Sequence, residues 1–370
     1  MATTAEYKLG EHTFGRGWYM IAEGKDLGEA PMNLRFFARD LVLYRGESGT
    51  PHLVDAYCPH MGAHLGRNST SYIVRDKERI QGESIRCPFH GWRFGPDGKC
   101  DDIAYSDQKP PSSASIRTYP VEERAGIVWM WFDEEEHEPL WDPPKLDMWD
   151  DPHWVQWKID DLEELEQHPI EIVDNMTDFA HFTPIHGSKD VHYFYNEFDA
   201  HVQWQMFGGG HRTLIEEGGP ILELDTWYEG PGILQSYMRG TFPTHMLIAH
   251  TPVEDGKVHV WHALMVKFDH EVTEADVPAA RAYQQASLEA FSQDFEIWQN
   301  KKPCFHPLMV RGDGPTDKCR IWYKQFYNPL DKASEFQDRV NGRHTTVDHR
   351  PEEEHEDVRT AVEWAARKAA

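Results

Sequence analysis

Two short cysteine–histidine pairs constrain this chain more than any other feature of its sequence. The first pair reads Cys58-Pro-His60 and the second reads Cys87-Pro-Phe-His90. A glycine follows each pair, Gly62 after the first and Gly91 after the second, and each pair contains a proline, which is typical of tight loops. Two thiolates and two imidazoles are a complete set of four metal ligands. The pattern therefore predicts a metal centre held between the tips of two loops.

Two identities fit this ligand set. Cys2His2 is a zinc set, and it is also the set of a Rieske [2Fe–2S] cluster, in which two thiolates hold one iron and two imidazoles hold the other. The spacing, C-x-H followed by C-x2-H, and the glycine-containing loops favour the cluster, because such loops bring backbone N–H groups close to bridging sulfides. We therefore predict a Rieske cluster on Cys58, His60, Cys87 and His90. Residues 68–84 form a polar insertion between the two loops.

Length, charge and hydropathy limit the class of protein. A chain of 370 residues can hold two domains with a core in each. Its net charge of −26 argues against nucleic acids and anionic membranes as partners. No apolar run approaches the roughly 20 residues of a membrane span. Five cysteines are an odd number, and we expect Cys100, Cys304 and Cys319 to be reduced thiols of a cytoplasmic protein.

The charge is unevenly distributed around the cluster pairs. Between His60 and Lys99 there are seven basic and four acidic residues, which gives a local net charge of +3 on an acidic protein. Such a positive collar suits the docking of an acidic electron donor. We expect Arg67 and Arg93 to contribute to that docking.

The first 152 residues predict a small all-β domain. Residues 36–44 and 126–132 read as strands, and Gly95-Pro-Asp-Gly98 is a strong hairpin signal. The acidic, proline-rich stretch 133–152 reads as a linker.

Residues 153–370 predict a second domain that mixes helices and strands. We expect a helix at 169–182, strands from 202 to 268, a longer helix at 274–300, a strand at 319–327 and a peripheral helix at 351–370.

The predicted helix at 169–182 carries candidates for a second metal site. Asp178 and His181 are three residues apart and share a helix face, and His186 follows Pro184, which ends or bends the helix. Two histidines and a distant carboxylate form the facial triad of non-haem Fe(II) oxygenases. Asp294 is the best candidate for that carboxylate, because it lies among large apolar residues, where an unpaired charge is costly.

Some roles at this second site stay open. Glu289 and Glu296 lie on turns close to Asp294 and are alternatives to it. Asp174 and Asn175 are either hydrogen-bonding partners of the ligands or ordinary residues of a helix N-terminus.

Taken together, the motifs resemble the α subunits of Rieske non-haem iron ring-hydroxylating oxygenases. The steroid branch, the oxygenase components of 3-ketosteroid 9α-hydroxylase, is the most similar, and the cholesterol 7-desaturases are more distant. The segments that carry the resemblance are Asp55-Ala-Tyr-Cys-Pro-His-Met-Gly, Arg86-Cys-Pro-Phe-His-Gly-Trp-Arg-Phe, Ile172-Val-Asp-Asn-Met-Thr-Asp-Phe-Ala-His-Phe, Gln293-Asp-Phe-Glu-Ile-Trp-Gln-Asn-Lys and Arg320-Ile-Trp-Tyr-Lys-Gln-Phe-Tyr.

The resemblance implies an α+β fold, with an N-terminal all-β Rieske domain and a helix-grip (START-like) catalytic domain that has an antiparallel sheet and a long C-terminal helix. It also implies a homotrimer in which the cluster of one subunit passes electrons to the iron of its neighbour, with Asp178 bridging a cluster histidine and His181. A separate NAD(P)H-dependent reductase, with or without a ferredoxin, would supply the electrons.

The predicted function is hydroxylation of a bulky, apolar, steroid-like substrate with O2. Aromatic and methionine side chains on the strands suit such a ligand, and we expect the pocket to be lined by Trp204, Phe207, Trp227, Tyr237, Met238, Phe242 and Trp261. Two alternatives remain. The first is a Rieske oxygenase that dihydroxylates, demethylates or desaturates another polycyclic, aromatic or N- or O-methyl substrate. The second is a non-catalytic electron carrier.

Overall fold

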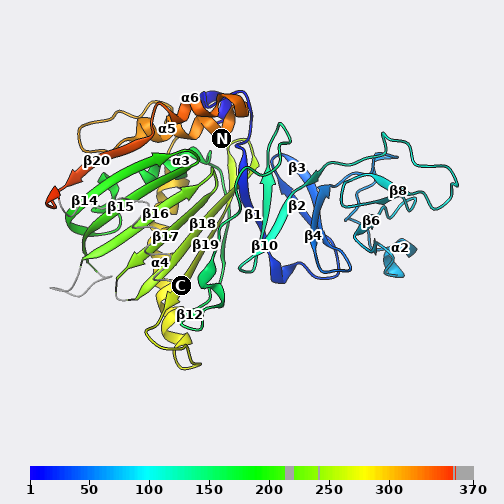
Figure 1. The fold of residues 1–370 in the computed structure, drawn as a ribbon, viewed down its shortest axis with the longest axis horizontal. Helices are drawn as coiled ribbons and strands as arrows, with labels where there is room; N and C mark the ends of the chain where they lie inside the picture. Colours follow the sequence, from blue (N-terminus) through cyan, green and yellow to red (C-terminus); the bar gives the residue numbers. More distant parts are fainter. Residues whose placement is uncertain (213–220, 241, 353–354, 356–370) are drawn as a thin grey trace. The chain divides into compact units, whose positions relative to one another are not determined.

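The computed structural model describes residues 1–212, 221–240, 242–352 and 355. The chain forms two compact units (Figure 1). The smaller unit is Trp18–Pro143, and the larger unit joins Met1–Gly17 to Pro144–Ala370. The boundary between Pro143 and Pro144 falls inside the predicted linker. The first 17 residues belong to the larger unit, whereas the sequence analysis grouped them with the β domain.

The smaller unit consists of three sheets with strand orders β1-β11-β10, β2-β3-β4-β9 and β5-β6-β7-β8. Its strands are β1 (Gly17–Glu23), β2 (Met32–Phe36), β3 (Arg39–Arg45), β4 (Pro51–Asp55), β5 (Ile80–Gln81), β6 (Ser84–Arg86), β7 (Arg93–Phe94), β8 (Cys100–Asp102), β9 (Thr118–Tyr119), β10 (Val121–Arg124) and β11 (Ile127–Phe132). Its short helices are the 3-10 turn η1 (Gly24–Asp26) and α2 (Tyr72–Arg75), and α2 lies in the polar insertion.

Two sequence predictions for this unit are confirmed, and a third is confirmed except for the start of the strand. The Gly95–Gly98 turn joins the antiparallel strands β7 and β8, and the strand expected at 126–132 is β11. The strand expected at 36–44 is β3 from Arg39 onward, while its first three residues form the end of β2 and a turn. Phe37 and Ala38 have φ angles of 54° and 55°, and they form the two-residue turn between β2 and β3. Positive φ at both central positions matches the twist of a tight hairpin, even though neither residue is a typical turn residue.

The larger unit is built on one antiparallel sheet with the order β12-β19-β18-β17-β16-β15-β14-β20, and β13 pairs with β19 as well. Its strands are β12 (Trp154–Val155), β13 (Asp160–Leu165), β14 (Ser188–Asp199), β15 (Val202–His211), β16 (Leu222–Glu229), β17 (Ile233–Arg239), β18 (Pro243–Glu254), β19 (Lys257–Lys267) and β20 (Gly342–Asp348). Its helices are α1 (Thr4–Tyr7), η2 (Asp147–Asp150), α3 (Ile170–Val173), η3 (Asp174–Met176), η4 (Ala180–Phe182), α4 (Val277–Asn300), α5 (Thr316–Lys324), η5 (Gln325–Tyr327), η6 (Leu330–Lys332) and α6 (Ala333–Gln337).

The strands expected from 202 to 268 and the long helix expected at 274–300 are confirmed as β15–β19 and α4. The strand expected at 319–327 is wrong, because this segment forms α5 and η5. Its buried residues Cys319, Trp322, Tyr323 and Phe326 follow the i, i+3, i+4, i+7 spacing of one helix face. The helix expected at 351–370 lies almost entirely outside the described residues.

The helix expected at 169–182 is broken rather than continuous. The helix α3 ends at Val173, and two 3-10 turns, η3 and η4, carry the chain on to Phe182. Asp178 and His181 therefore do not share one face of a regular α-helix. They are held by local turns instead.

The core of the larger unit lies between the sheet and α4. The buried side chains of α4 include Phe291, Phe295 and Trp298, which form one face of the helix and pack with Val258 and Val260 of β19. Figure 1 shows α4 running across the strands of the sheet. None of the helices in the described part of the chain combines the length and the apolarity that a bilayer crossing requires.

Several histidines of the larger unit have a lowered pKa, and three of these, His168, His245 and His250, are fully buried. Burial lowers the pKa of His250 to about 3 and that of His245 to about 4. Burial, and to a lesser extent the nearby charge of Arg320, lowers the pKa of His168 to about 3. The unfolded chain, in which these side chains have an ordinary pKa of 6.5, binds more protons than the folded chain below that pH. The stabilisation that comes from keeping these histidines neutral is therefore fully present above pH 6.5 and is lost as the pH falls toward 4.

We predict that the free energy of unfolding falls by about 1.4 kcal/mol per histidine at pH 5.5, or about 4 kcal/mol for the three. Urea unfolding at pH 7.5, 6.5 and 5.5 measures this loss. His245→Gln should reduce the loss of stability at pH 5.5 by about 1.4 kcal/mol, because its amide keeps a contact with Gln235 but takes up no proton. A variant with the same pH dependence as the natural chain would contradict the assignment.

Candidate cluster and metal sites

The two cysteine–histidine loops of the smaller unit have the same backbone geometry. In the first loop the N–H of Gly62 donates to the carbonyl of Cys58, and in the second the N–H of Gly91 donates to the carbonyl of Cys87. The two glycines have φ angles of 73° and 74°. This left-handed conformation strains any residue with a side chain, so glycine at this position lets each loop turn back on itself. The chain thus presents its two ligand pairs on two matching loops.

The donor atoms of these loops suit a cluster. Cys58 and Cys87 are buried and free. The neighbouring Cys58 thiol, together with backbone N–H groups of Phe89 and His90, lowers the pKa of Cys87 to about 6. The Cys87 thiol and burial raise the pKa of Cys58. Backbone donors aimed at a sulfur stabilise the thiolate form that metals require.

The two histidines of the loops lie close together. The rings of His60 and His90 have centroids 4.7 Å apart, and Trp92 stacks on His60 at 4.4 Å. The Nδ1 atom of His60 is buried and has no hydrogen-bond partner among the described residues. An imidazole nitrogen left in this state is available to a metal. The residues present therefore fit a [2Fe–2S] cluster.

The positive collar is only partly free to dock a partner. Arg93 pairs with Asp101 at 2.6 Å, and Arg86 pairs with Glu78 at 2.8 Å. In the described chain no acidic side chain forms an ion pair with Arg67, which is exposed and lies on a polar hollow with His64 and Phe89. The ion pair with Asp101 offsets the charge of Arg93, so Arg93 can contribute less to docking an acidic donor than expected. The charge of Arg67 is not offset in this way.

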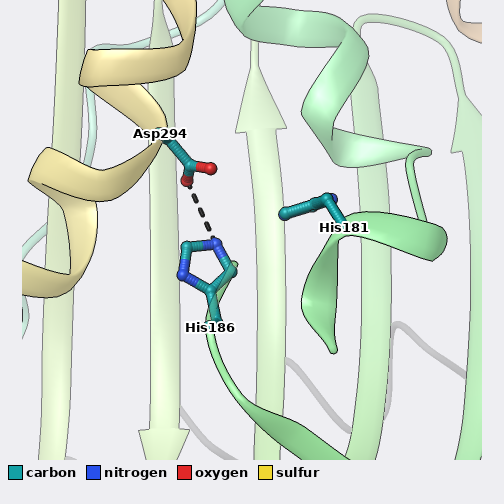
Figure 2. Close-up of side chains that lie close together, drawn as sticks. All are labelled: His181, His186 and Asp294. Carbon is teal, nitrogen blue, oxygen red and sulfur yellow. Dashed lines mark ion pairs between the residues drawn. The ribbon is translucent and has the colours of Figure 1, made fainter. Parts of the chain in front are cut away.

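The second group of ligand candidates comes together in the larger unit. One donor atom from each of His181, His186 and Asp294 lies within 4.8 Å of the other two. The His186 Nε2 atom is 3.1 Å from the Asp294 carboxylate, and Figure 2 shows that carboxylate, carried by α4, facing the His186 ring with His181 beside it. All three side chains are largely buried. Two imidazoles and one carboxylate in this arrangement match the donor set of a non-haem Fe(II) site.

Asp178 orients His181 from the side. The Asp178 Oδ2 atom lies 3.5 Å from His181 Nδ1, and its Oδ1 accepts the backbone N–H groups of Ala180 and His181. Burial opposes charge on both side chains, but the attraction between them across 3.5 Å outweighs it, with the charge of Asp294 adding to the effect on the histidine. The pKa of His181 is therefore raised and the pKa of Asp178 is lowered. A carboxylate on the second nitrogen of an imidazole ligand fixes the ring and its tautomer.

The residues with open roles take different positions. Asn175 lines the same cavity as His181, His186 and Asp294. Asp174 is instead held by a two-pronged ion pair with Arg320 of α5, with a shortest contact of 2.5 Å. The alternatives to Asp294, Glu289 and Glu296, are exposed and do not line the cavity. The structure therefore brings Asn175 and Asp294 to the site and leaves Asp174 in a structural pair.

A cavity opens onto the three candidate ligands, and most of its lining is apolar. The apolar lining residues are Ile172, Met176, Phe182, Leu222, Leu224, Leu234, Met238, Met246, Ile248, Ala290, Phe291 and Trp298. Of the seven residues expected from sequence, only Met238 lines it. Trp204, for example, belongs to a separate cluster with Tyr193, Tyr195 and Met206. The direction in which a strand residue points depends on sheet register, which residue type does not reveal.

One polar row crosses the wall of this cavity. Gln205, Thr226 and Ser236 are directly paired neighbours on β15, β16 and β17, and all three line the cavity. The hydroxyl groups of Thr226 and Ser236 are hydrogen-bonded at 2.7 Å. The sequence analysis missed this row. A usable signal was present, because polar residues in the middle of otherwise apolar strands of a buried sheet require partners.

Comparisons with known proteins show the family of the chain. Residues 17–120 match the Rieske [2Fe-2S] domain, and residues 130–327 match the 3-ketosteroid 9alpha-hydroxylase C-terminal domain. A 3-ketosteroid-9-alpha-monooxygenase oxygenase component of Rhodococcus rhodochrous is 32% identical over 337 residues, which cover 87% of this chain and 83% of the relative. The chain belongs to the 3-ketosteroid 9α-hydroxylase family of Rieske oxygenases. It is thus an oxidoreductase with an α+β fold, and the predicted family is confirmed.

Other relatives mark the breadth of the family. The cholesterol 7-desaturase nvd of Xenopus laevis is 30% identical over 346 residues, covering 85% of this chain and 72% of the relative. Among solved structures, Pseudomonas putida CBB5 NdmA with caffeine has a TM-score of 0.68 at 16% identity, covering 94% of this chain and 99% of that one. Dicamba monooxygenase with non-heme iron has a TM-score of 0.56 at 16% identity, covering 88% and 97%. The similarities to these two solved structures are evidence for the fold alone.

Proposed function

We propose that the chain is the terminal oxygenase component of a Rieske monooxygenase that hydroxylates a steroid-like substrate. The observation that carries this proposal is the cavity in which His181, His186 and Asp294 meet beneath a largely apolar wall. An apolar pocket with a few convergent polar groups is the usual form of a small-molecule site. The chain also contains a Rieske domain, whose cluster would supply electrons to such a site.

The lining of the cavity supports a large, mostly hydrocarbon substrate with at least one oxygen substituent. Its apolar side chains would cover the hydrocarbon frame, while the polar row of Gln205, Thr226 and Ser236 can hydrogen-bond a ketone or a hydroxyl. The names of the relatives support the same class, since one is a ketosteroid monooxygenase and another a cholesterol desaturase.

Different residues of the chain would hold the metals, bind the substrate and exclude water. Cys58, His60, Cys87 and His90 would hold the cluster, and His181, His186 and Asp294 would hold a mononuclear Fe(II). When bound, the cluster supplies single electrons and the Fe(II) supplies the activation of O2.

The remaining residues would orient these ligands and the substrate. Asp178 keeps the His181 ring in one orientation, and Asn175 adds an amide to the cavity wall next to the ligands. The apolar lining keeps water away from the reacting carbon.

Desaturation of a sterol nucleus is the second candidate reaction. The cholesterol 7-desaturase relative is nearly as similar to this chain as the ketosteroid monooxygenases are, at 30% against 32% identity. Both reactions begin at a C–H bond held beside the same ligand set. The mass of the product distinguishes them, because hydroxylation adds one oxygen atom and desaturation removes two hydrogen atoms.

The decisive experiment combines the purified chain with a surrogate reductase, NADH and O2, and offers a panel of 3-ketosteroids and sterols beside simple aromatic and N-methyl compounds. A steroid that gains one oxygen would support the proposal. Product from an aromatic or N-methyl compound alone would overturn the substrate class. About two irons per chain instead of about three would instead indicate an electron carrier.

We also propose the partners that this function requires. A separate NAD(P)H-dependent reductase, alone or through a ferredoxin, would reduce the cluster, and three copies of the chain would assemble so that one subunit's cluster serves the neighbouring iron. The free cysteines suit a cytoplasmic setting.

Reversal of one exposed charge tests the docking of the electron donor. We predict that Arg67→Glu slows reduction of the cluster by the reductase about tenfold at low ionic strength, and that added salt narrows the difference. Stopped-flow bleaching of the cluster absorption measures the rate. Lys25→Glu is the matched control, since Lys25 is an exposed cation that already pairs with Glu23. Equal rates of cluster reduction in Arg67→Glu and the natural chain would show that Arg67 does not take part in docking the electron donor.

A further inference from the structure

The predicted iron ligands come from two elements that must be held at a constant separation. His181 and His186 follow α3, whereas Asp294 lies about two turns before the end of α4. Metal–ligand distances tolerate errors of only about 0.2 Å. Specific contacts must therefore connect α3, which precedes the two histidines, to the C-terminal end of α4.

A buried glutamine makes the first connection. The side-chain amide of Gln167, three residues before α3, donates to the carbonyl of Trp298 at 2.8 Å and to the carbonyl of Lys301 at 3.0 Å. The last carbonyls of a helix have no partner within the helix. Gln167 is 6% exposed, so it caps the ligand-bearing helix from inside the protein.

A buried carboxylate makes the second connection. Glu171 of α3 is completely buried and forms an ion pair with Lys301, the residue that directly follows α4. The Oε1 atom of Glu171 also accepts the backbone N–H of Cys304 at 2.9 Å and the hydroxyl of Tyr7. A charge in this position is costly to bury unless it is paired and hydrogen-bonded, as Glu171 is.

Apolar contacts between the same two elements leave little room for them to slide. Ile172 of α3 packs in one cluster with Phe291, Phe295 and Trp298 of α4. Trp298 is four residues after Asp294, so the carbonyl that Gln167 holds belongs to the helical turn next to the ligand. A shift of this turn would move the Asp294 carboxylate, which is now 3.1 Å from His186.

We propose that Gln167, Glu171 and Lys301, together the α3–α4 clamp, are positioning residues for the mononuclear metal site. They touch neither metal nor substrate, and they set the distance between Asp294 and the two histidines. This inference rests on the proposed function, because it presumes that the three ligands bind Fe(II).

The test measures Fe(II) binding and not turnover. In Gln167→Leu, the side chain keeps a similar size and loses both hydrogen bonds. We expect Fe(II) to dissociate about tenfold more readily, as judged by competition with a chelator, in line with the effect of removing groups that support metal ligands. The electron paramagnetic resonance spectrum of the Fe(II)–nitric oxide adduct should broaden, while the absorption of the [2Fe–2S] cluster should not change.

A matched control lies elsewhere in the same unit. Gln325 is also a buried glutamine whose amide donates to two backbone carbonyls, those of Ala200 and Trp322, each at 3.0 Å. Gln325→Leu loses the same kind of bonds and should bind Fe(II) as tightly as the natural chain. Equal weakening in both variants would overturn the proposal, because the effect would then be a general loss of stability.

A gentler pair of variants covers the case in which Gln167→Leu does not fold. Lys301→Gln removes the charge that pairs with Glu171, and Lys302→Gln removes the charge of the exposed neighbour. Weaker Fe(II) binding in Lys301→Gln alone supports the clamp, and equal binding in both overturns it. If the natural chain itself holds only the two irons of the cluster, the proposed function fails, which is a different result from failure of the clamp.

Discussion

Replacing His186 with alanine should remove the mononuclear iron and leave the [2Fe–2S] cluster in place. His186 supplies one of three candidate donor atoms, and its Nε2 lies 3.1 Å from the Asp294 carboxylate. Two protein ligands bind Fe(II) far more weakly than three, so we expect iron content to fall from about three to about two per chain. Product formation should fall by more than about 100-fold, since loss of even a supporting residue costs 10- to 100-fold. Iron analysis and product mass measure the two effects.

His192→Ala is the control for this prediction. His192 lies on β14, six residues further along the chain, and its side chain is exposed. The control should keep all three irons and full turnover. A His186→Ala protein that still holds about three irons would remove His186 from the ligand set.

Replacing Asp178 with asparagine should separate metal binding from turnover. The amide oxygen of asparagine can still accept the backbone N–H groups of Ala180 and His181, so the local turn survives. The negative charge that faces His181 Nδ1 is lost, and with it the proposed bridge from a cluster histidine of a neighbouring subunit. We expect both metal centres to be retained and turnover to fall by about 100-fold or more.

Single-turnover kinetics isolate the affected step. Oxidation of the pre-reduced cluster in the presence of substrate and O2 should slow by the same factor, while its reduction by dithionite should keep its rate. Asp317→Asn is a suitable control, because Asp317 is an exposed acid on α5. Normal turnover in Asp178→Asn would contradict the proposal that Asp178 bridges a cluster histidine and His181.

The cluster loops were predictable because their chemistry is local. Cysteine, histidine and glycine at fixed short spacings impose one loop geometry, and the structure has that geometry twice. The long helix α4 was predictable for a similar reason, since its length and apolar spacing leave few other conformations.

The errors arose where local patterns are ambiguous. The strand predicted at 36–44 begins three residues too early, because the turn at Phe37 and Ala38 separates β2 from β3. The aromatic run after Cys319 suggests a strand by composition, yet its spacing is helical. Composition misled the prediction in a segment where periodicity was the better guide.

By itself, the sequence determined the family and predicted the two candidate ligand sets, because the donor residues sit in short motifs and Asp294 is an acid in an apolar helix face. Only the tertiary structure decided which residues line the cavity and which contacts hold α3 and α4 together. The polar row of Gln205, Thr226 and Ser236 exists because three strands pair in one register. The α3–α4 clamp joins residues about 130 positions apart. Contacts of this kind depend on how separate elements pack, which local sequence patterns do not encode.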